Sequence, residues 1–136
     1  MLGEQFVEEK GKITGQRVLD VEGPKIETSF SASGKYKGVD ASDMGTYATI
    51  PRPGGVLYGE GQGVIMTSDS GEMATWIGQG IAHFIGPGKV RFHGSLFYRT
   101  PSSTTGKLSA LNNLVGVFEY ETDEMGNTSA KVWEWK

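Results

Sequence analysis

The feature that most constrains this chain is the shortness of the segments between its candidate strands. Stretches of alternating apolar and polar residues recur along the sequence, bounded by Gly, Pro, Asn, Asp and Ser. The turns between the later stretches are short, at residues 51–55, 68–71, 86–88 and 123–127. A parallel crossover needs about a dozen residues or more. We therefore predict that the strands run antiparallel in a meander.

Nine segments have the strand pattern, and they cover residues 12–20, 25–33, 35–41, 45–50, 56–67, 72–85, 89–99, 115–122 and 128–135. The polar stretch 101–106 predicts a loop, and leucines at positions 108, 111 and 114 predict one or two helical turns that pack on the sheet. We expect one domain over residues 1–136. Its predicted fold is an all-β antiparallel meander closed into a barrel of about eight strands, with one short helix near 107–114.

Composition and charge exclude several classes of protein. The 136 residues are 37% hydrophobic and 21% charged, as expected for one folded domain. A net charge of −3 does not attract a phosphate backbone, so we expect no nucleic-acid partner. The chain has no cysteine, and its two histidines, His83 and His93, show no metal-ligand spacing. We therefore expect no metal and no cofactor.

Targeting signals are also missing from the sequence. No apolar run reaches the length of about 18 residues that a membrane-spanning helix needs. The N-terminal segment 1–11 carries too many charges for a secretory signal. Together with the lack of cysteine, this pattern favours the cytoplasm and predicts no membrane partner.

Aligning the central strands on their short turns gives the sheet two different faces. Gly63 then lies opposite Trp76, and Gly80 lies opposite both Gly59 and Gly94. One face is mainly apolar and is the predicted core: Leu57, Ile65, Ala74, Trp76, Ala82, Phe84, Val90, Phe92, Leu96 and Tyr98. The other face mixes polar and apolar residues and is predicted to point outward.

Glycines interrupt the apolar face and should leave room inside a barrel. The first hypothesis is therefore a barrel of unassigned function that binds a small apolar molecule in a central cavity lined by Leu57, Trp76, Phe84, Phe92, Leu96 and Tyr98. The row of Gly59, Gly80 and Gly94 marks either a sharp bend of the sheet or a groove approached by the short helix or a ligand. We favour the bend or the helix.

The second hypothesis is an isomerase or cyclase that acts on a small apolar substrate. Tyr58, Glu60 and His93 would cluster on neighbouring strands of the polar face. A carboxylate and an imidazole near a tyrosine can transfer protons to and from a bound molecule. The alternative, which we favour, is an ordinary solvated exterior, because polar residues alternate outward by default. No catalytic residue is assigned, and the orientation of the sheet decides between the two interpretations.

The third hypothesis is a structural module that forms oligomers. Trp133 and Trp135 share the second face of the last hairpin with Val115 and Val117. Exposed aromatic patches mark interfaces, so these tryptophans are covered either by the N-terminal segment or by a neighbouring subunit. We expect a homo-oligomer, a dimer or a trimer.

Three sequence features lie between residues 59 and 121. They are the Gly-x-Gly-x-Gly strand at 59–63 that continues into Val-Ile-Met-Thr, the Gly-Gln-Gly strand at 78–80, and the segment Ser-Ala-Leu-Asn-Asn-Leu-Val-Gly-Val-Phe-Glu at 109–119. This stretch resembles the allene oxide cyclase-like, calycin-type barrel superfamily, including its uncharacterised small bacterial members. The resemblance implies an eight-stranded antiparallel barrel with a central apolar cavity, often in a dimer or trimer. Members with known roles isomerise or bind small apolar molecules.

Overall fold

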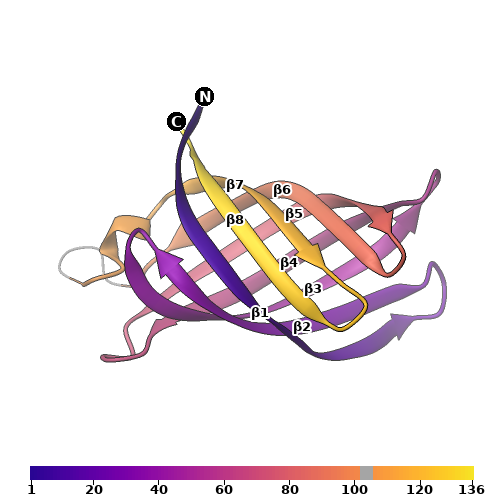
Figure 1. The fold of residues 1–136 in the computed structure, drawn as a ribbon, viewed down its shortest axis with the longest axis horizontal. Helices are drawn as coiled ribbons and strands as arrows, with labels where there is room; N and C mark the ends of the chain where they lie inside the picture. The colour runs from indigo at the N-terminus through magenta and orange to yellow at the C-terminus, as the bar shows by residue number, and fades with distance from the viewer. Residues whose placement is uncertain (102–105) are drawn as a thin grey trace.

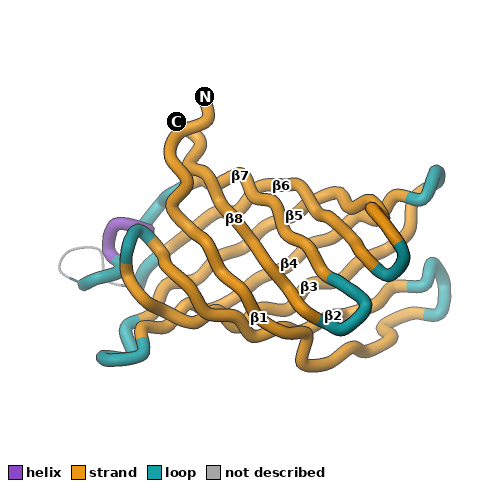
Figure 2. The backbone as a smooth tube through the Cα atoms, in the orientation of Figure 1, coloured by secondary structure: helices purple, strands orange, loops and turns teal. Residues whose placement is uncertain are grey.

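Each strand pairs with the next one along the chain, and the last strand pairs back with the first (Figure 1). The computed structural model describes residues 1–101 and 106–136. In these residues the fold is a closed antiparallel barrel, as predicted, with β1 (Leu2–Asp20), β2 (Lys25–Tyr36), β3 (Val39–Arg52), β4 (Val56–Thr67), β5 (Met73–Gly86), β6 (Lys89–Arg99), β7 (Val115–Thr122) and β8 (Asn127–Trp135). Figure 2 shows that strands make up most of the backbone, with a short helical turn, η1 (Ser109–Leu111), at one end.

The first strand begins much earlier than predicted. β1 starts at Leu2 rather than near residue 12 and pairs with both β2 and β8. Its charged residues hide the strand pattern, but most of them point outward: Glu8 and Lys10 are exposed, whereas Val7 is buried. This early part of β1 provides the pairing edge that closes the barrel.

The predicted strand at 35–41 is wrong. Lys37 and Gly38 form the turn between β2 and β3, with φ values of 50° and 79°. This left-handed backbone is easy for glycine and ends the strand there. Residues 25–52 therefore form one hairpin of two long strands. The loop predicted at 101–106 falls mostly on residues 102–105, which lie outside the described residues.

The register of the central strands agrees with the prediction. Gly63 pairs with Trp76, and Gly80 pairs with both Gly59 and Gly94. Because side chains alternate along a strand, this register fixes the two faces. The predicted core face points into the barrel, and its fully buried members are Ile65, Ala74, Trp76, Ala82, Phe92 and Tyr98.

One residue predicted for the core is exposed. Phe84 has the correct parity to face inward, but its side chain is 60% exposed. It lies near the β5–β6 turn, beside a register shift between Phe84 and Gly86. Alternation fixes the side of the sheet that a residue occupies, but it does not tell how far along the strand the packed interior extends. The prediction that Phe84 faces the interior is therefore wrong.

The segment between β6 and β7 closes one end of the barrel. The helix predicted near 107–114 is a single 3-10 turn, η1, and Leu108 and Leu111 on this segment are buried. The carboxylate of Glu72 accepts hydrogen bonds from the backbone N–H of Lys107 at 2.7 Å and of Leu108 at 2.8 Å. The two leucines are thereby held in the barrel end. No helix in the described residues is long and apolar enough to cross a membrane.

The two ends of the chain lie side by side where β1 and β8 extend beyond the rest of the barrel (Figure 1). Trp135 pairs with Leu2, and both residues are 55% exposed. Trp133 is partly buried and pairs with Gln5. The N-terminal strand thus lies beside the tryptophans, yet it leaves Trp135 exposed. The homo-oligomer stays a prediction, which sedimentation of the purified protein at micromolar concentration would test.

Candidate functional site

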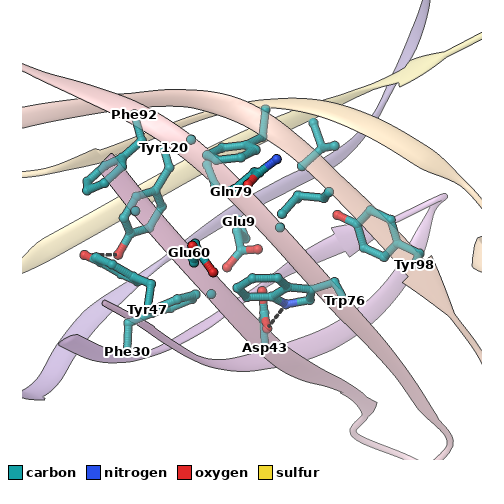
Figure 3. A pocket seen from close by; sticks show the side chains of 18 residues that line it. Glu9, Phe30, Asp43, Tyr47, Glu60, Trp76, Gln79, Phe92, Tyr98 and Tyr120 are labelled. Atoms are coloured by element: carbon teal, nitrogen blue, oxygen red, sulfur yellow. Dashed lines mark hydrogen bonds between the residues drawn. The ribbon is translucent and has the colours of Figure 1, made fainter. Parts of the chain in front are cut away.

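The interior of the barrel holds a cavity of about 70 Å³ (Figure 3). Aromatic side chains form much of its wall: Phe30, Tyr47, Trp76, Phe92, Tyr98, Phe118 and Tyr120. They come from β2, β3, β5, β6 and β7, so both sides of the barrel contribute to the cavity wall. One water molecule needs only about 10–15 Å³. The cavity therefore has room for several waters or for one small organic molecule.

The structure places four of the six predicted cavity residues in this wall. They are Trp76, Phe92, Leu96 and Tyr98. Leu57 is partly buried and packs against the core without lining the cavity, and Phe84 is exposed at the rim. The two residues that do not line the cavity lie near turns: Leu57 is beside the β3–β4 turn, and Phe84 is beside the β5–β6 turn.

A patch of bare backbone forms one side of the cavity. Gly59 and Gly61 on β4 pair with Gly80 and Gly78 on β5, and all four glycines line the cavity. A Cβ atom on Gly80 would lie 2.7 Å from the backbone oxygen of His93 on β6. Real side chains do not tolerate such a distance, so the close approach of the strands requires glycine here.

The row of Gly59, Gly80 and Gly94 fits the predicted bend, and approach of a ligand to it stays a prediction. A Cβ atom on Gly94 would lie 2.0 Å from the backbone oxygen of Gln79, as expected where a barrel sheet bends sharply. Gly59 and Gly80 also line the cavity. The short helix is not the element that approaches this row, because η1 lies at the end of the barrel (Figure 2).

Two further glycines allow the indole of Trp76 to lie against the wall. A Cβ atom on Gly63 would lie 2.4 Å from Nε1 of Trp76, and one on Gly45 would lie 2.8 Å from its Cζ2. The indole therefore crosses β4 where no side chain stands. On β3, its Nε1 donates a 2.9 Å hydrogen bond to Oδ1 of Asp43 (Figure 3). The glycines position the indole, and the indole positions the carboxylate.

Two buried carboxyl groups lie in the same cavity. Glu9 from β1 is 7% exposed and Asp43 from β3 is 4% exposed, and both line the cavity near Trp76 (Figure 3). The hydroxyl of Tyr36 on β2 interacts electrostatically with both carboxyls, but it is buried and forms no hydrogen bond of normal geometry in the described residues. No lysine, arginine or histidine among the described residues lines the cavity. The pair therefore has no basic side chain as a partner there.

Burial and mutual repulsion decide which carboxyl keeps a proton. Burial, and then the negative charge of Asp43, raise the pKa of Glu9 well above its usual range. Burial also raises the pKa of Asp43, but hydrogen bonds from Glu9 and Trp76 oppose that rise. Glu9 therefore keeps its proton to a higher pH than an exposed glutamate does, and while it keeps the proton it is a hydrogen-bond donor to Asp43.

Four aromatic rings form a layer across the barrel beside this pair. Phe30, Tyr47, Phe92 and Tyr120 are joined by ring-centroid distances of 5.4 to 5.6 Å. The hydroxyl oxygens of Tyr47 and Tyr120 lie 3.3 Å apart (Figure 3). Burial raises the pKa of both hydroxyls, so they stay neutral at physiological pH. The layer adds two neutral polar groups to an otherwise apolar wall.

Tyr58, Glu60 and His93 lie on the outer face of the barrel. The hydroxyl of Tyr58 is 2.9 Å from Oε1 of Glu60 and 2.7 Å from Oε1 of Gln79, in exposed contacts. His93 instead faces Glu119 at 3.3 Å. Glu60 borders the cavity at the glycine patch, but its side chain is exposed. The three residues do not converge in an enclosed pocket, so the interpretation of them as an active site is wrong and the solvated exterior describes them.

Glu9 and Asp43 were not predicted from the sequence. No motif marks either residue, and they come from strands that are not neighbours in the sheet. The signal that was available is their parity: Asp43 lies two residues from the buried Ala41 and Gly45, and Glu9 lies two residues from the buried Val7. A carboxylate at an inward-facing strand position is unusual, because charged side chains are seldom fully buried unless they are paired. Reading that signal required knowing that residues 2–11 are a strand.

Comparisons with known proteins identify relatives of the fold. No family model and no curated protein sequence matches the chain. The crystal structure of a conserved protein of unknown function from Rhodopseudomonas palustris superposes with a TM-score of 0.73 at 14% identity, covering 98% of this chain and 97% of that one. A protein of unknown function from Clostridium acetobutylicum ATCC 824 gives a TM-score of 0.72 at 15% identity, covering 98% of each chain. The chain shares their fold over its whole length.

Proposed function

We propose that this protein binds a small, mainly apolar molecule inside its barrel. The observation that carries the proposal is an aromatic cavity that contains a carboxyl pair without a basic partner. Burying a charge costs free energy unless it is paired and hydrogen-bonded. Perturbed carboxyl groups in cavities are typical of functional sites. An interior built only for stability would instead be filled by apolar side chains, as the η1 end of this barrel is.

Membership of the allene oxide cyclase-like superfamily is part of the same proposal. Its support is the sequence resemblance of residues 59–121 together with a closed eight-stranded barrel that encloses a central cavity. The two structural relatives have no stated function. A role in binding a small molecule fits what the resemblance implies.

Native mass spectrometry of the purified protein tests ligand binding and counts the subunits in the same measurement. We expect an additional non-covalent mass on the folded chain, which is lost on denaturation. Ala130 is a small residue of the cavity wall on β8, so Ala130→Phe should fill the space and prevent retention of this mass. Ala110→Phe, at an exposed position of η1, is the matched control and should retain it. Equal retention by both variants would place the ligand outside the barrel.

A second candidate function is an isomerase that uses the carboxyl pair. The specific observation is that two buried carboxyl groups share the cavity and that Asp43 accepts the Trp76 indole N–H, an asymmetric pair that can serve as an acid and a base. Asp43 would take a proton from a carbon of the substrate, and Glu9 would deliver its proton to another carbon of the same molecule. The reaction is then a double-bond shift that consumes no oxidant or reductant.

Hydrogen exchange tests this second candidate without knowledge of the physiological substrate. The retained molecule should incorporate deuterium at carbon when the protein is incubated in deuterated water. Glu9→Gln should slow this incorporation by at least about 100-fold, the usual contribution of a general acid or base. Glu8→Gln, at the exposed neighbouring position, should leave the rate unchanged. A molecule that is released with no deuterium on carbon would leave binding as the function.

A further inference from the structure

The charge inside the cavity constrains the chemistry of the ligand. We propose that the ligand is a small organic ammonium ion, whose charged group pairs with Glu9 and Asp43 and whose apolar part packs against the aromatic wall. This inference rests on the proposed function and names the class of molecule bound at the same site.

The first support is the unbalanced charge of the wall. Glu9 and Asp43 are both more than nine-tenths buried, and no basic side chain among the described residues lines the cavity with them. Removing one partner from a buried ion pair leaves a costly uncompensated charge. Without a ligand, the buried carboxyl pair lacks a positively charged partner. A cation from outside would supply the missing partner, whereas a carboxylate or phosphate would be repelled.

The second support is an unused polar group beside the pair. The hydroxyl of Tyr36 is fully buried beside Glu9 and Asp43, and no hydrogen bond of normal geometry satisfies it in the described residues. Besides Glu9, Asp43 has the indole N–H of Trp76 as a donor, on its Oδ1. A primary ammonium brings three N–H donors. A bound ammonium group would donate hydrogen bonds to the two carboxyl groups, which their buried environment does not fully satisfy.

The third support is the arrangement of rings around the carboxyl pair. Trp76 and Phe30 stack with their centroids 6.3 Å apart, and Tyr98 lines the cavity on the other side of Trp76 (Figure 3). The faces of aromatic rings carry negative charge density and attract ammonium groups when water is excluded. Aromatic walls also accept the apolar part of such a molecule. The cavity volume of about 70 Å³ limits that part to one ring or a short chain.

Two probes of equal shape separate the charge from the apolar part. Benzylamine is a cation at pH 7, and benzyl alcohol is its neutral counterpart with the same number of heavy atoms. Isothermal titration of the purified protein should give a Kd for benzylamine at least tenfold lower than for benzyl alcohol. Benzoate, which has the opposite charge, should not bind measurably.

Conservative variants locate the origin of this preference. Asp43→Asn keeps an acceptor for the Trp76 indole while it removes the charge, and Glu9→Gln neutralises the other member. In each variant the preference for benzylamine over benzyl alcohol should fall to less than about threefold, with the affinity for benzyl alcohol retained. The matched controls are Asp40→Asn on β3 and Glu8→Gln on β1, both at exposed positions, and they should keep the full preference.

The outcomes distinguish this inference from the proposed function. Equal affinity of the wild-type protein for benzylamine and benzyl alcohol would overturn the ammonium ligand while it supports an apolar one. A preference that survives in Asp43→Asn and Glu9→Gln, or one that Mg²⁺ or K⁺ competes away at millimolar concentration, would overturn it as well. Failure of all three organic probes to bind, together with no retained mass in native mass spectrometry, would overturn the proposed function itself.

Discussion

The two carboxylate sites of this barrel are built in opposite ways. At the closed end, Glu72 is partly exposed and accepts two backbone N–H groups, which hold the segment of Leu108 and Leu111 in place. In the cavity, Glu9 and Asp43 are buried and face each other, and none of the described residues of the wall is basic. The first site satisfies its carboxylate with backbone donors, whereas the second has the Trp76 indole on Asp43 and no positive charge.

The difference shows which end of the interior serves stability. Near η1 the space is filled by two leucines, and the carboxylate there completes the hydrogen bonds of an irregular segment. In the cavity, four glycines leave the wall bare and two carboxyl groups are buried together. Proteins tolerate such local violations of packing and charge pairing mainly at functional sites. Removing a carboxylate from the two sites should therefore change stability in opposite directions.

The largest effect is expected at the closed end, for Leu111→Ala. The side chain of Leu111 is fully buried, so its truncation leaves a cavity and should lower the free energy of unfolding by about 2–5 kcal/mol. Urea denaturation followed by circular dichroism measures this loss. Leu19→Ala, at a position that is 41% exposed, should change it by less than about 0.5 kcal/mol. A similar small loss in both variants would show that η1 does not stabilise the barrel.

A smaller loss is expected when Glu72 is removed. Glu72→Ala deletes two hydrogen bonds between a charged carboxylate and backbone N–H groups, and such bonds contribute about 1.5–3 kcal/mol. Amide hydrogen exchange should show faster exchange at Lys107 and Leu108. Glu22→Ala, at an exposed turn position, is the control and should alter neither quantity. Unchanged exchange at these two amides would contradict the role given to Glu72.

The fold could be predicted from the sequence because strand pairing depends on local features. Short turns exclude crossovers, and alternation fixes the faces once a turn sets the register, as the confirmed pairing of Gly63 with Trp76 shows. The errors occur where another constraint takes over. Charged residues in the first half of β1 belong to a strand because β2 and β8 pair on either side of them, and the pairing with β8 is a contact between the two ends of the chain.

The site was harder to predict, for a related reason. The part of the wall on β5 and β6 follows from alternation, so Trp76, Phe92, Leu96 and Tyr98 were predicted, whereas the aromatic residues from β2, β3 and β7 were not. Asp43 and Glu9 come together only after the barrel has closed, and the long-range closure is not encoded in any short motif. An inward carboxylate on one strand is a weak signal by itself. Two inward carboxylates in one cavity point to a candidate site.

The cavity can be perturbed without touching its charges. Gly63→Ala would place a Cβ atom 2.4 Å from the Trp76 indole, so the ring must move away from the wall and from Asp43. We expect a loss of stability of about 1–3 kcal/mol, as for other overpacked sites, and a shifted Trp76 Nε1–H resonance in the NMR spectrum. Gly15→Ala, where a Cβ atom meets no neighbour within 4 Å, should leave both unchanged. An unmoved indole resonance in Gly63→Ala would mean that glycine is not what positions the ring.

The smallest and most specific effect is a gain of stability in Glu9→Gln. The raised pKa of Glu9 means that the folded chain holds this proton more tightly than the unfolded chain does. Below the ordinary value of 4.5 both states are protonated, and Glu9 contributes its full stability. As the pH rises above that value the unfolded chain loses the proton first, so the stability of the wild-type fold decreases toward neutral pH. Glutamine removes this titration.

The groups that face Glu9 do not obscure the measurement. Tyr36 on β2 and Tyr98 on β6 have their pKa values raised by burial and stay neutral between pH 5 and 8, and the Trp76 indole does not titrate. Asp43 on β3 titrates together with Glu9, because each carboxyl changes the pKa of the other. The difference between wild type and Glu9→Gln therefore reports the carboxyl pair as one unit.

We compare the free energy of unfolding of Glu9→Gln with that of wild type at pH 4.5 and at pH 7. The difference should be larger, in favour of Glu9→Gln, at pH 7, by about 1.4 kcal/mol for each pH unit by which the pKa of Glu9 is raised. Urea titrations of wild type, Glu9→Gln and the exposed control Glu8→Gln at the two pH values measure it. A stabilised Glu9→Gln protein that has lost its preference for an ammonium ligand would show that this carboxyl is retained at a cost in stability, which separates the cavity from the closed end. A Glu9→Gln protein that is less stable than wild type at pH 7 would instead make Glu9 a structural residue, in the same class as Glu72.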